Sequence, residues 1–216
     1  MHQKINEMPK TWPIARKGSK YIAMSNHDKY RSVPLLFIIR DMLKLAKNRK
    51  EVKYMLLNSE IKVNNKIRKD EKFPINVLDV ITLEKIKKNY RLEIVNKKFK
   101  LNEIAEKDKE EKIIKIIGKR LLAKNKVQAN LEYGNNFLIK DNFSIGDSVI
   151  LDTKQNKIKQ ILQLKEGAKV EIVSGKHAGE KGKLKKIIAL EKGKKYDIEL
   201  KDKIVSLPMK TIIVIK

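Results

Sequence analysis

The chain has 216 residues, and its 51 lysines and arginines outnumber its 26 acidic residues to give a formal net charge of +25. It has no cysteine, which excludes disulfides and thiolate metal sites, and its three histidines are too scattered for a metal cluster. No apolar run approaches the roughly 20 residues of a membrane helix, so we expect neither a membrane span nor a signal peptide. Such a charge excess repels itself unless a polyanion neutralises it, which favours a nucleic-acid partner.

The positive charge is concentrated outside the middle of the chain. Residues 1–50 carry a net charge of +9 and residues 51–100 of +6, residues 101–150 only +1, and residues 151–216 again +9. This distribution indicates two or three separate anion-binding surfaces around a nearly neutral centre.

Residues 1–33 show no sustained periodicity and are expected to form an irregular basic arm. Trp12, the only tryptophan, is expected to anchor this arm on a neighbouring domain, with stacking on a base as the alternative. His27 lies in a loop, where a surface or supporting role is the ordinary interpretation and a phosphate contact the less common one. The candidate RNA-binding residues of the arm are Arg16, Lys17, His27 and Lys29.

Two short helices are predicted after Pro34. In the first, apolar residues recur at helical spacing and would form one buried stripe, while three basic residues stay in solvent. The stripe is Leu35, Ile38, Ile39, Met42, Leu45 and Ala46, and the basic residues are Arg40, Lys44 and Lys47.

Asn48 is the expected N-cap of the second helix, with Glu51 three residues later to complete a capping box. Val52, Met55 and Leu56 would share its buried face. Arg49, Lys50 and Lys53 lie near its start, where cations are locally unfavourable unless a phosphate docks there.

A hairpin is predicted next, because Ile61, Val63 and Ile67 alternate with polar residues around Asn64-Asn65, a pair that tolerates the positive φ angles of a tight turn. The two helices and hairpin resemble the S-four-type RNA-binding domain, whose hairpin often reads valine, asparagine, glycine, lysine. Here Asn65 stands in the glycine position. The resemblance implies RNA contacts, and the alternative is a basic core with no special partner. The candidate contacts are Arg40, Lys44, Arg49, Lys50 and Lys53 on the helices, and Lys66, Arg68 and Lys69 on the hairpin.

The middle of the chain predicts a small all-β domain. Residues 84–100 alternate as strands do, the mixed-charge run 103–112 is typical of a solvated helix face, and five short apolar runs follow between residues 113 and 164. Turn signals at Gly118, 134–136, 141–142 and 146–147 separate these runs. The low charge of this region suggests packing and spacing more than RNA binding.

The C-terminal segment carries the sharpest motif. Val170 and Ile172 alternate inward, while Gly175, Gly179 and Gly182 mark places where the backbone bends or closely approaches another group. The segment 167–184 resembles a KOW motif, which opens small SH3-like barrels, with further strands expected over 196–200, 204–207 and 212–215. Such a loop could approach a sugar-phosphate strand through its N–H groups, or the glycines could only form a barrel corner. The candidate contacts are Lys176, His177, Lys181 and Lys183.

A phosphate-binding loop of the P-loop type is excluded. For Gly182-Lys183 the required earlier glycine is His177 and the residue after the lysine is Leu184, and Gly193-Lys194 fails in the same way. The sequence therefore predicts no GTPase or ATPase.

Three further runs resemble a single protein family. They are residues 9–17, residues 33–36, and residues 68–81, which include Phe73-Pro74 and Leu78–Ile81. In this order and spacing they resemble the archaeal and eukaryotic small-subunit ribosomal protein four-e family. The resemblance implies a structural, non-enzymatic constituent of the cytoplasmic ribosome, scaffolding ribosomal RNA through phosphate and shape contacts beside neighbouring ribosomal proteins. It implies no cofactor, metal, small-molecule substrate or membrane. The early end after the last strand favours the archaeal form, and the N-terminus looks shorter than is usual in the family.

The expected fold is α+β, mainly β, and multi-domain. It comprises a basic arm (1–33), a two-helix-plus-hairpin S-four-type module (34–84), a central β domain (85–164) and a KOW SH3-like barrel (165–216). One alternative is an RNA-modifying enzyme that uses an S-four-type domain, although the central region is small for a catalytic domain and its acids (Glu132, Asp141, Asp147 and Asp152) fall mostly at turns. The other is a KOW-type transcription elongation factor, which would lack the module at 34–82.

Overall fold

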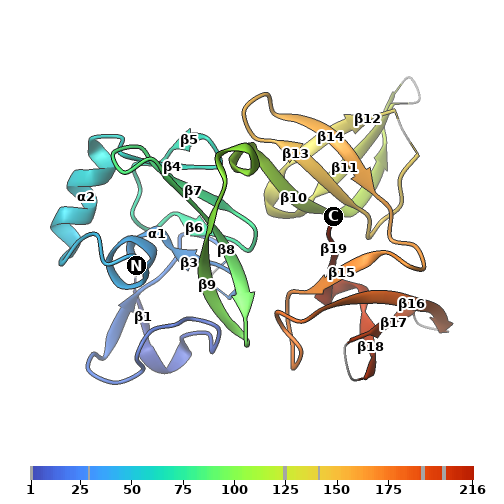
Figure 1. Cartoon of the computed structure of the whole chain (residues 1–216), viewed down its shortest axis with the longest axis horizontal. Helices are drawn as coiled ribbons and strands as arrows, with labels where there is room; N and C mark the ends of the chain where they lie inside the picture. Colours follow the sequence, from blue (N-terminus) through green and yellow to red (C-terminus); the bar gives the residue numbers. More distant parts are fainter. Residues whose placement is uncertain (1, 29, 124–125, 141, 191–192, 201–202) are drawn as a thin grey trace. The chain divides into compact units, whose positions relative to one another are not determined.

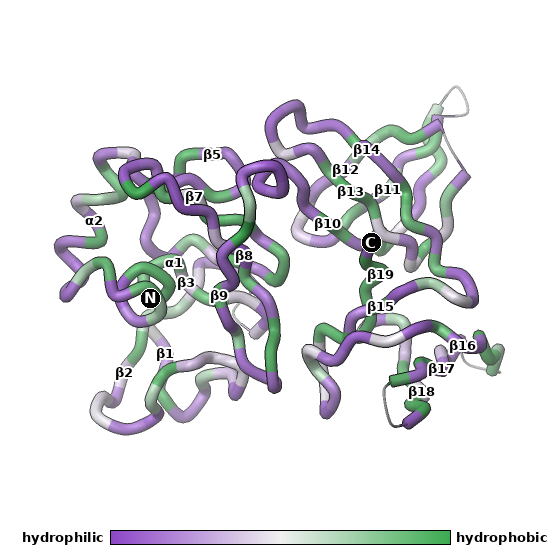
Figure 2. Tube along the Cα trace, viewed as in Figure 1, coloured by the Kyte–Doolittle hydropathy of each residue, from purple (hydrophilic) through white to green (hydrophobic). Residues whose placement is uncertain are grey.

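The structure is a computed structural model that describes residues 2–28, 30–123, 126–140, 142–190, 193–200 and 203–216. It is mostly β with few helices, which confirms the expectation of a mainly β protein (Figure 1). The chain divides into two compact units, Met1–Lys112 and Ile113–Lys216. Hydrophobic and hydrophilic residues are interspersed along the strands of both units (Figure 2).

The first unit is built on a five-stranded antiparallel sheet of order β5-β4-β7-β8-β9, with two small ladders, β1-β2 and β3-β6. Its strands are β1 (His2–Lys4), β2 (Tyr21–Ala23), β3 (Val33–Pro34), β4 (Ile61–Val63), β5 (Lys66–Ile67), β6 (Pro74–Ile75), β7 (Val80–Leu83), β8 (Lys88–Val95) and β9 (Lys98–Ile104). Its helices are α1 (Leu35–Phe37), which continues as a π-helical turn (Ile38–Met42), and α2 (Arg49–Leu57), with 3₁₀ turns at Ile5–Glu7 and Glu106–Glu110.

The first helix is shorter than the apolar pattern predicts. Leu35, Ile38 and Ile39 are fully buried as expected. The helix ends at Met42, however, with a wide turn in which the Leu43 N–H donates to the Ile38 carbonyl at 2.9 Å. Lys44 then adopts φ 55°, a left-handed conformation that a right-handed helix cannot continue through. The prediction that one helical stripe extends to Leu45 and Ala46 is therefore wrong.

Helix α2 begins as its sequence predicts. The Asn48 side chain accepts a hydrogen bond from the Glu51 N–H at 3.0 Å. The Glu51 carboxylate reaches back to the N–H of Lys47 at 2.7 Å, one residue earlier than in a standard capping box. Val52 and Leu56 are fully buried, so the predicted inner face is confirmed for these two residues.

The hairpin turn is also confirmed. Strands β4 and β5 are joined by Asn64 and Asn65, whose φ angles are 50° and 61°. The Asn64 side chain donates to the Asp79 carboxylate at 2.9 Å and accepts from the Val80 N–H at 3.0 Å. This residue therefore forms the turn and also ties it to β7.

The N-terminal arm is more ordered than expected, because β1 pairs with β2. Trp12 anchors it, as predicted: the residue is 2% exposed, its indole N–H donates to the Ser32 carbonyl at 3.0 Å, and its ring centroid lies 5.3 Å from that of Phe37. Base stacking by Trp12 is thereby disfavoured.

The mixed-charge run 103–112 is not a solvated helix face. It holds the end of β9 and a short 3₁₀ turn. Lys112 is buried and forms an ion pair with the buried Asp79. Charge content alone did not distinguish this inward-pointing lysine from its exposed neighbours.

The second unit holds two five-stranded sheets, of order β12-β11-β10-β13-β14 and β18-β17-β16-β15-β19. Their strands are β10 (Glu111–Leu121), β11 (Val127–Leu131), β12 (Asn136–Ile139), β13 (Ser148–Asp152), β14 (Lys157–Leu162), β15 (Lys169–Ile172), β16 (Lys181–Leu190), β17 (Gly193–Glu199), β18 (Ile204–Pro208) and β19 (Ile212–Val214). Four of the five predicted apolar runs lie within strands, and the fifth, residues 158–164, extends two residues past the end of β14. The turn predicted at Gly118 is wrong, because this residue lies inside β10 beside a register shift.

Hydrogen bonds join the two sheets of the second unit. The Ser148 hydroxyl accepts from the Val214 N–H at 3.0 Å. The buried Lys115 ammonium donates to the carbonyl of Ile212 at 2.8 Å and also to that of Met209. Polar contacts of this kind fix the register of the sheets beyond what apolar packing specifies.

Candidate RNA-binding surfaces

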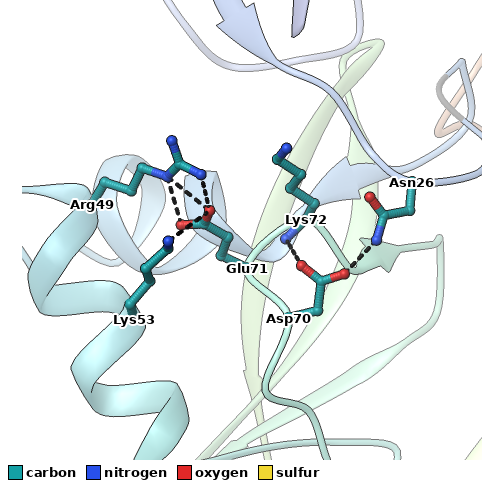
Figure 3. Close-up of polar contacts among 6 residues, drawn as sticks. All are labelled: Asn26, Arg49, Lys53, Asp70, Glu71 and Lys72. Carbon is teal, nitrogen blue, oxygen red and sulfur yellow. Dashed lines mark hydrogen bonds and ion pairs between the residues drawn. The ribbon is translucent and has the colours of Figure 1, made fainter. Parts of the chain in front are cut away.

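The first candidate surface is the start of α2 together with the loop 68–73, which we call the α2 surface. The loop is held against α1, since the N–H groups of Leu35 and Leu36 donate to the carbonyls of Phe73 at 3.0 Å and Glu71 at 2.9 Å. Figure 3 shows Arg49 and Lys53 converging from α2 on the carboxylate of Glu71. The surface therefore depends on a contact between segments about 20 residues apart.

Glu71 partly neutralises two of the predicted RNA-binding cations. Arg49 Nε lies 2.7 and 2.9 Å from its two carboxylate oxygens, Nη2 makes a further bond, and Lys53 Nζ lies at 4.0 Å. The Glu71 side chain is only 6% exposed, while that of Arg49 is 55% exposed. Hydrogen bonding to Glu71 raises the pKa of Arg49, and the contact with both carboxylate oxygens holds the guanidinium in one orientation. Lys50 is exposed on the same turn.

A second group of contacts surrounds Phe73. The guanidinium of Arg68 lies 4.2 Å from the ring centroid of Phe73, and the His27 ring meets Phe73 edge-on at 6.2 Å. Asn26 donates to the Asp70 carboxylate, which also accepts from the Lys72 N–H at 2.9 Å (Figure 3). The structure thus brings together His27 and Arg68, which lie 41 residues apart in the chain.

The remaining candidates of the first unit are spread over its surface. Arg40 is half-buried and does not simply stay in solvent: it pairs with Asp41 at 2.9 Å and its guanidinium lies 5.3 Å from the Phe37 centroid. Arg16 is exposed and donates to the Met8 carbonyl at 2.9 Å. Lys29 lies outside the described residues. The other exposed candidates are Lys17, Lys44, Lys66 and Lys69.

Sequence reasoning missed three residues of the α2 surface. Glu71 organises its cations, Phe73 its stacked groups, and Lys72 adds a further positive charge. An acidic pair inside the basic run 66–72 was the available signal for Glu71. Its partner could not be read from the chain, because the contact joins two separate segments.

The second candidate surface is the loop 174–183 and its flanking strands, which we call the barrel-loop surface. Lys176, Lys181 and Lys183 are exposed there. His177 is largely covered, and its Nδ1 lies 3.0 Å from the Glu180 carboxylate, so it supports the loop more than it projects from it. Lys183 lies across from Lys169 on β15 and from Glu199 on β17.

The glycines of this loop have separate structural causes. Gly175 and Gly179 have φ angles of 95° and 91°, which disfavour other residues. A Cβ on Gly182 would lie 2.5 Å from the Glu199 carbonyl oxygen and 2.8 Å from the Ile198 side chain. The close approach at Gly182 is therefore made to β17 within the protein.

The described residues offer little for other chemistries. They contain no group of His, Asp or Glu side chains that could hold a metal ion. Among them, no helix has both the length and the apolar character needed to cross a bilayer. Two acids of the central region have structural roles: Asp147 accepts from the N–H groups of Ser144 and Leu164, and Asp152 from those of Lys154 and Gln155.

Known proteins resemble this chain over most of its length. The family model described as "Ribosomal family S4e" matches residues 86–158. The small ribosomal subunit protein eS4 of Archaeoglobus fulgidus is 37% identical over 188 residues, covering 86% of this chain and 79% of the relative. The protein of the same name from Methanocella arvoryzae is 36% identical over 189 residues, covering 86% and 80%.

A solved structure agrees with these sequence matches. The crystal structure of the 30S ribosomal protein S4e from Thermoplasma acidophilum superposes with a TM-score of 0.74 at 27% identity, covering 87% of this chain and 96% of that one. The chain is more than 30% identical to these relatives, covers about four fifths of their length and shares the fold of the solved structure. It therefore belongs to the S4e family of small-subunit ribosomal proteins.

Proposed function

We propose that the protein is a structural constituent of the small ribosomal subunit that binds and scaffolds ribosomal RNA. The observation that carries the proposal is its identity of 36–37% to archaeal proteins named small ribosomal subunit protein eS4. The net charge of +25 supports it, because binding a polyanion relieves the self-repulsion of the chain. Its working place would be the cytoplasmic ribosome, among neighbouring ribosomal proteins.

The proposed division of labour follows the modules expected from the sequence. Residues 34–84 would act as an S-four-type RNA-binding module, residues 165–216 as a KOW barrel, and residues 85–164 as the β domain between them, with residues 1–33 as an arm. The turn at Asn64-Asn65 and the order β18-β17-β16-β15-β19 are compatible with the two outer modules. Strands β8 and β9 pair with β7 in the first unit, however, so the structure favours a boundary after Lys112 over one after residue 84.

The α2 surface and the barrel-loop surface would each neutralise RNA phosphates. Lysine is a mobile point charge suited to phosphate, whereas the arginine fork suits fixed, bidentate contacts. Recognition would read mainly the shape and backbone of the RNA. The protein would act without catalysis, and the comparisons give no support to an RNA-modifying enzyme or a KOW elongation factor.

Sedimentation tests the proposal. The tagged chain, expressed in an archaeal host, is expected to travel with small subunits in a sucrose gradient at physiological salt. It should move to the top of the gradient when the salt is raised, because counterion release makes phosphate contacts salt-dependent. A chain that stays at the top at physiological salt would contradict the proposal and favour a free factor.

A further inference from the structure

The first unit contains a pocket next to the α2 surface, and Arg49 belongs to both. Its volume is about 640 Å³, within the roughly 300–1,000 Å³ of small-molecule sites. The N-terminal arm forms one side of it and the helices α1 and α2 the other. The arm contributes Ala15, Tyr21 and Ile22 to the lining, and the helices contribute Leu36, Phe37 and Arg49.

The floor of this pocket is apolar. The buried apolar residues Ile22, Leu36 and Phe37 are among those that line it. Tyr21 is 49% exposed at its edge, with the Lys20 ammonium 5.5 Å from the ring centroid. An apolar floor beside an exposed aromatic ring is the combination on which unstacked bases are held by single-strand binding proteins.

The rim of the pocket is cationic. Arg40, Arg49 and Lys72 line it, and among its described lining residues there is no aspartate or glutamate. Arg49 donates hydrogen bonds to Glu71 from Nε and Nη2. Figure 3 shows the remaining guanidinium nitrogen of Arg49 and the Lys72 ammonium extending away from that carboxylate. Arg40 likewise uses only Nε and Nη2 on Asp41. The acids therefore fix the two arginines and leave donors for an anion.

We infer that this pocket holds one unstacked nucleotide of the bound RNA, with its base on the apolar floor and its phosphate among Arg40, Arg49 and Lys72. The inference rests on the proposed function and deepens it. A ligand that joins a flat ring to an anionic group would match an apolar floor and a cationic rim. RNA is favoured over a protein segment because the three cations outnumber the two acids, Asp41 and Glu71, that hold the arginines, and because unpaired bases are what proteins read in folded RNA.

Nucleotide titration tests the inference on the full chain. Amide signals of Ala15, Tyr21 and Ala23 in ¹H–¹⁵N spectra would be followed with 5′-AMP, 5′-UMP, ribose 5-phosphate and inorganic phosphate. We expect saturable shifts with both nucleotides, and binding at least about tenfold weaker with ribose 5-phosphate and phosphate, because these probes have no base to stack. A single-stranded tetranucleotide should bind more tightly than 5′-UMP, since it adds phosphate contacts.

Two variants with matched controls localise the effect. Ala15→Trp would fill the pocket and abolish the nucleotide shifts, whereas Ala189→Trp, at an exposed position on β16, would leave them unchanged. Lys72→Gln should weaken nucleotide binding several-fold, and Lys100→Gln, on the exposed side of β9, should not. Circular dichroism and the thermal midpoint of Ala15→Trp establish that the variant is folded.

Three results would overturn the inference. Equal binding of 5′-AMP and inorganic phosphate would mean a simple anion site. Tighter binding of N-acetylphenylalanine than of either nucleotide would point to a protein segment, and tighter binding of 5′-UMP than of the tetranucleotide would point to a free nucleotide. The proposed function is tested separately: if the wild-type chain sediments with small subunits while its pocket amides ignore every nucleotide, only the inference fails.

Discussion

The two units carry almost the same net charge, +13 for residues 1–112 and +12 for residues 113–216, but they organise it differently. In the first unit, cations are held by acids and rings: Arg49 by Glu71, Arg40 by Asp41, and Arg68 by Phe73. In the barrel-loop surface, Lys176, Lys181 and Lys183 project from a β scaffold into solvent.

If both surfaces bind RNA as proposed, this difference predicts two kinds of contact. A guanidinium fixed by a buried carboxylate has given up much of its conformational freedom before binding, and it presents its donors in one direction. An exposed lysine gives charge without direction. We therefore expect the first unit to position the RNA and the barrel-loop surface to supply most of the salt-dependent attraction.

The largest expected effect comes from the buried ion pair of the first unit. Asp79→Ala removes a carboxylate that pairs with the buried Lys112 and accepts from the Asn64 side chain and the Asn76 N–H. Removing one member of a buried ion pair should lower the free energy of unfolding by about 3–5 kcal/mol. Chemical denaturation measures it, and hydrogen exchange should locate the destabilisation within residues 1–112.

Glu103→Ala is the matched control, because it breaks the exposed pair with Lys88 in the same sheet. Its cost should be no more than about 1 kcal/mol. Equal costs for the two variants would show that burial does not distinguish these pairs.

The next largest effect is expected in the second unit. Gly182→Ala would force a Cβ against the Glu199 carbonyl of β17, and overpacking of this kind typically costs about 1–3 kcal/mol. Gly118→Ala on β10 is the control, since its Cβ would meet only ordinary contacts of 3.5 Å or more. Thermal unfolding of both variants compares them, and an unchanged midpoint for Gly182→Ala would contradict the packing described here.

Two triple variants compare how the α2 surface and the barrel-loop surface contribute to RNA binding. Replacing Lys176, Lys181 and Lys183 with alanine should reduce the slope of log K against log salt by up to about 0.7–0.9 for each RNA phosphate that is no longer neutralised. Replacing Arg49, Lys50 and Lys53 should weaken binding but change the slope less, because Glu71 already offsets part of their charge. Filter binding to small-subunit RNA over a salt series gives both slopes.

The outcomes of the slope measurement separate the two surfaces. A larger slope change for the α2 variant than for the barrel-loop variant would reverse the proposed roles. An unchanged affinity for either variant would remove that surface from the RNA interface.

The smallest expected effect is a pH dependence at the turn after β13. Hydrogen bonds from the Gln155 and Lys154 N–H groups, with the nearby Lys159, hold the pKa of Asp152 below its usual value. The folded-state pKa is lower than the unfolded one, so this stabilisation is present above the unfolded pKa of about 3.9 and disappears as the pH falls through the folded value. Its size should stay below about 1 kcal/mol.

Asp152→Asn keeps an oxygen acceptor but cannot ionise. The stability advantage of the wild type over this variant should therefore shrink as the pH is lowered from about 5 to about 2, as followed by urea denaturation. A constant difference over that range would mean that the carboxylate charge does not stabilise the turn.

Local features of the fold could be predicted from the sequence because each depends on neighbouring residues. The N-cap at Asn48, the turn at Asn64-Asn65 and the strand at Val127–Leu131 are examples. The early end of the first helix could not be predicted. It depends on the left-handed conformation of Lys44, and lysine is not a residue type that favours this conformation.

The candidate site was predictable in its charges and not in its geometry. The basic residues of α2 and of the barrel loop were visible in the chain, but Glu71, Phe73 and the pocket depend on contacts between distant segments. The turn predicted at Gly118 is wrong for a related reason. Pairing with neighbouring strands, more than the conformational freedom of glycine, places this residue in β10.

Cross-linking within the assembled particle tests most directly whether the α2 surface and the barrel-loop surface contact RNA. Small subunits that contain the tagged chain would be irradiated with ultraviolet light, digested, and searched by mass spectrometry for peptides joined to RNA. Cross-links are expected on peptides from the α2 surface and the arm around Tyr21 beside it, and on peptides from the loop 174–183. If assembled subunits show cross-links to this chain only outside both regions, the proposed RNA contacts of the two surfaces are wrong.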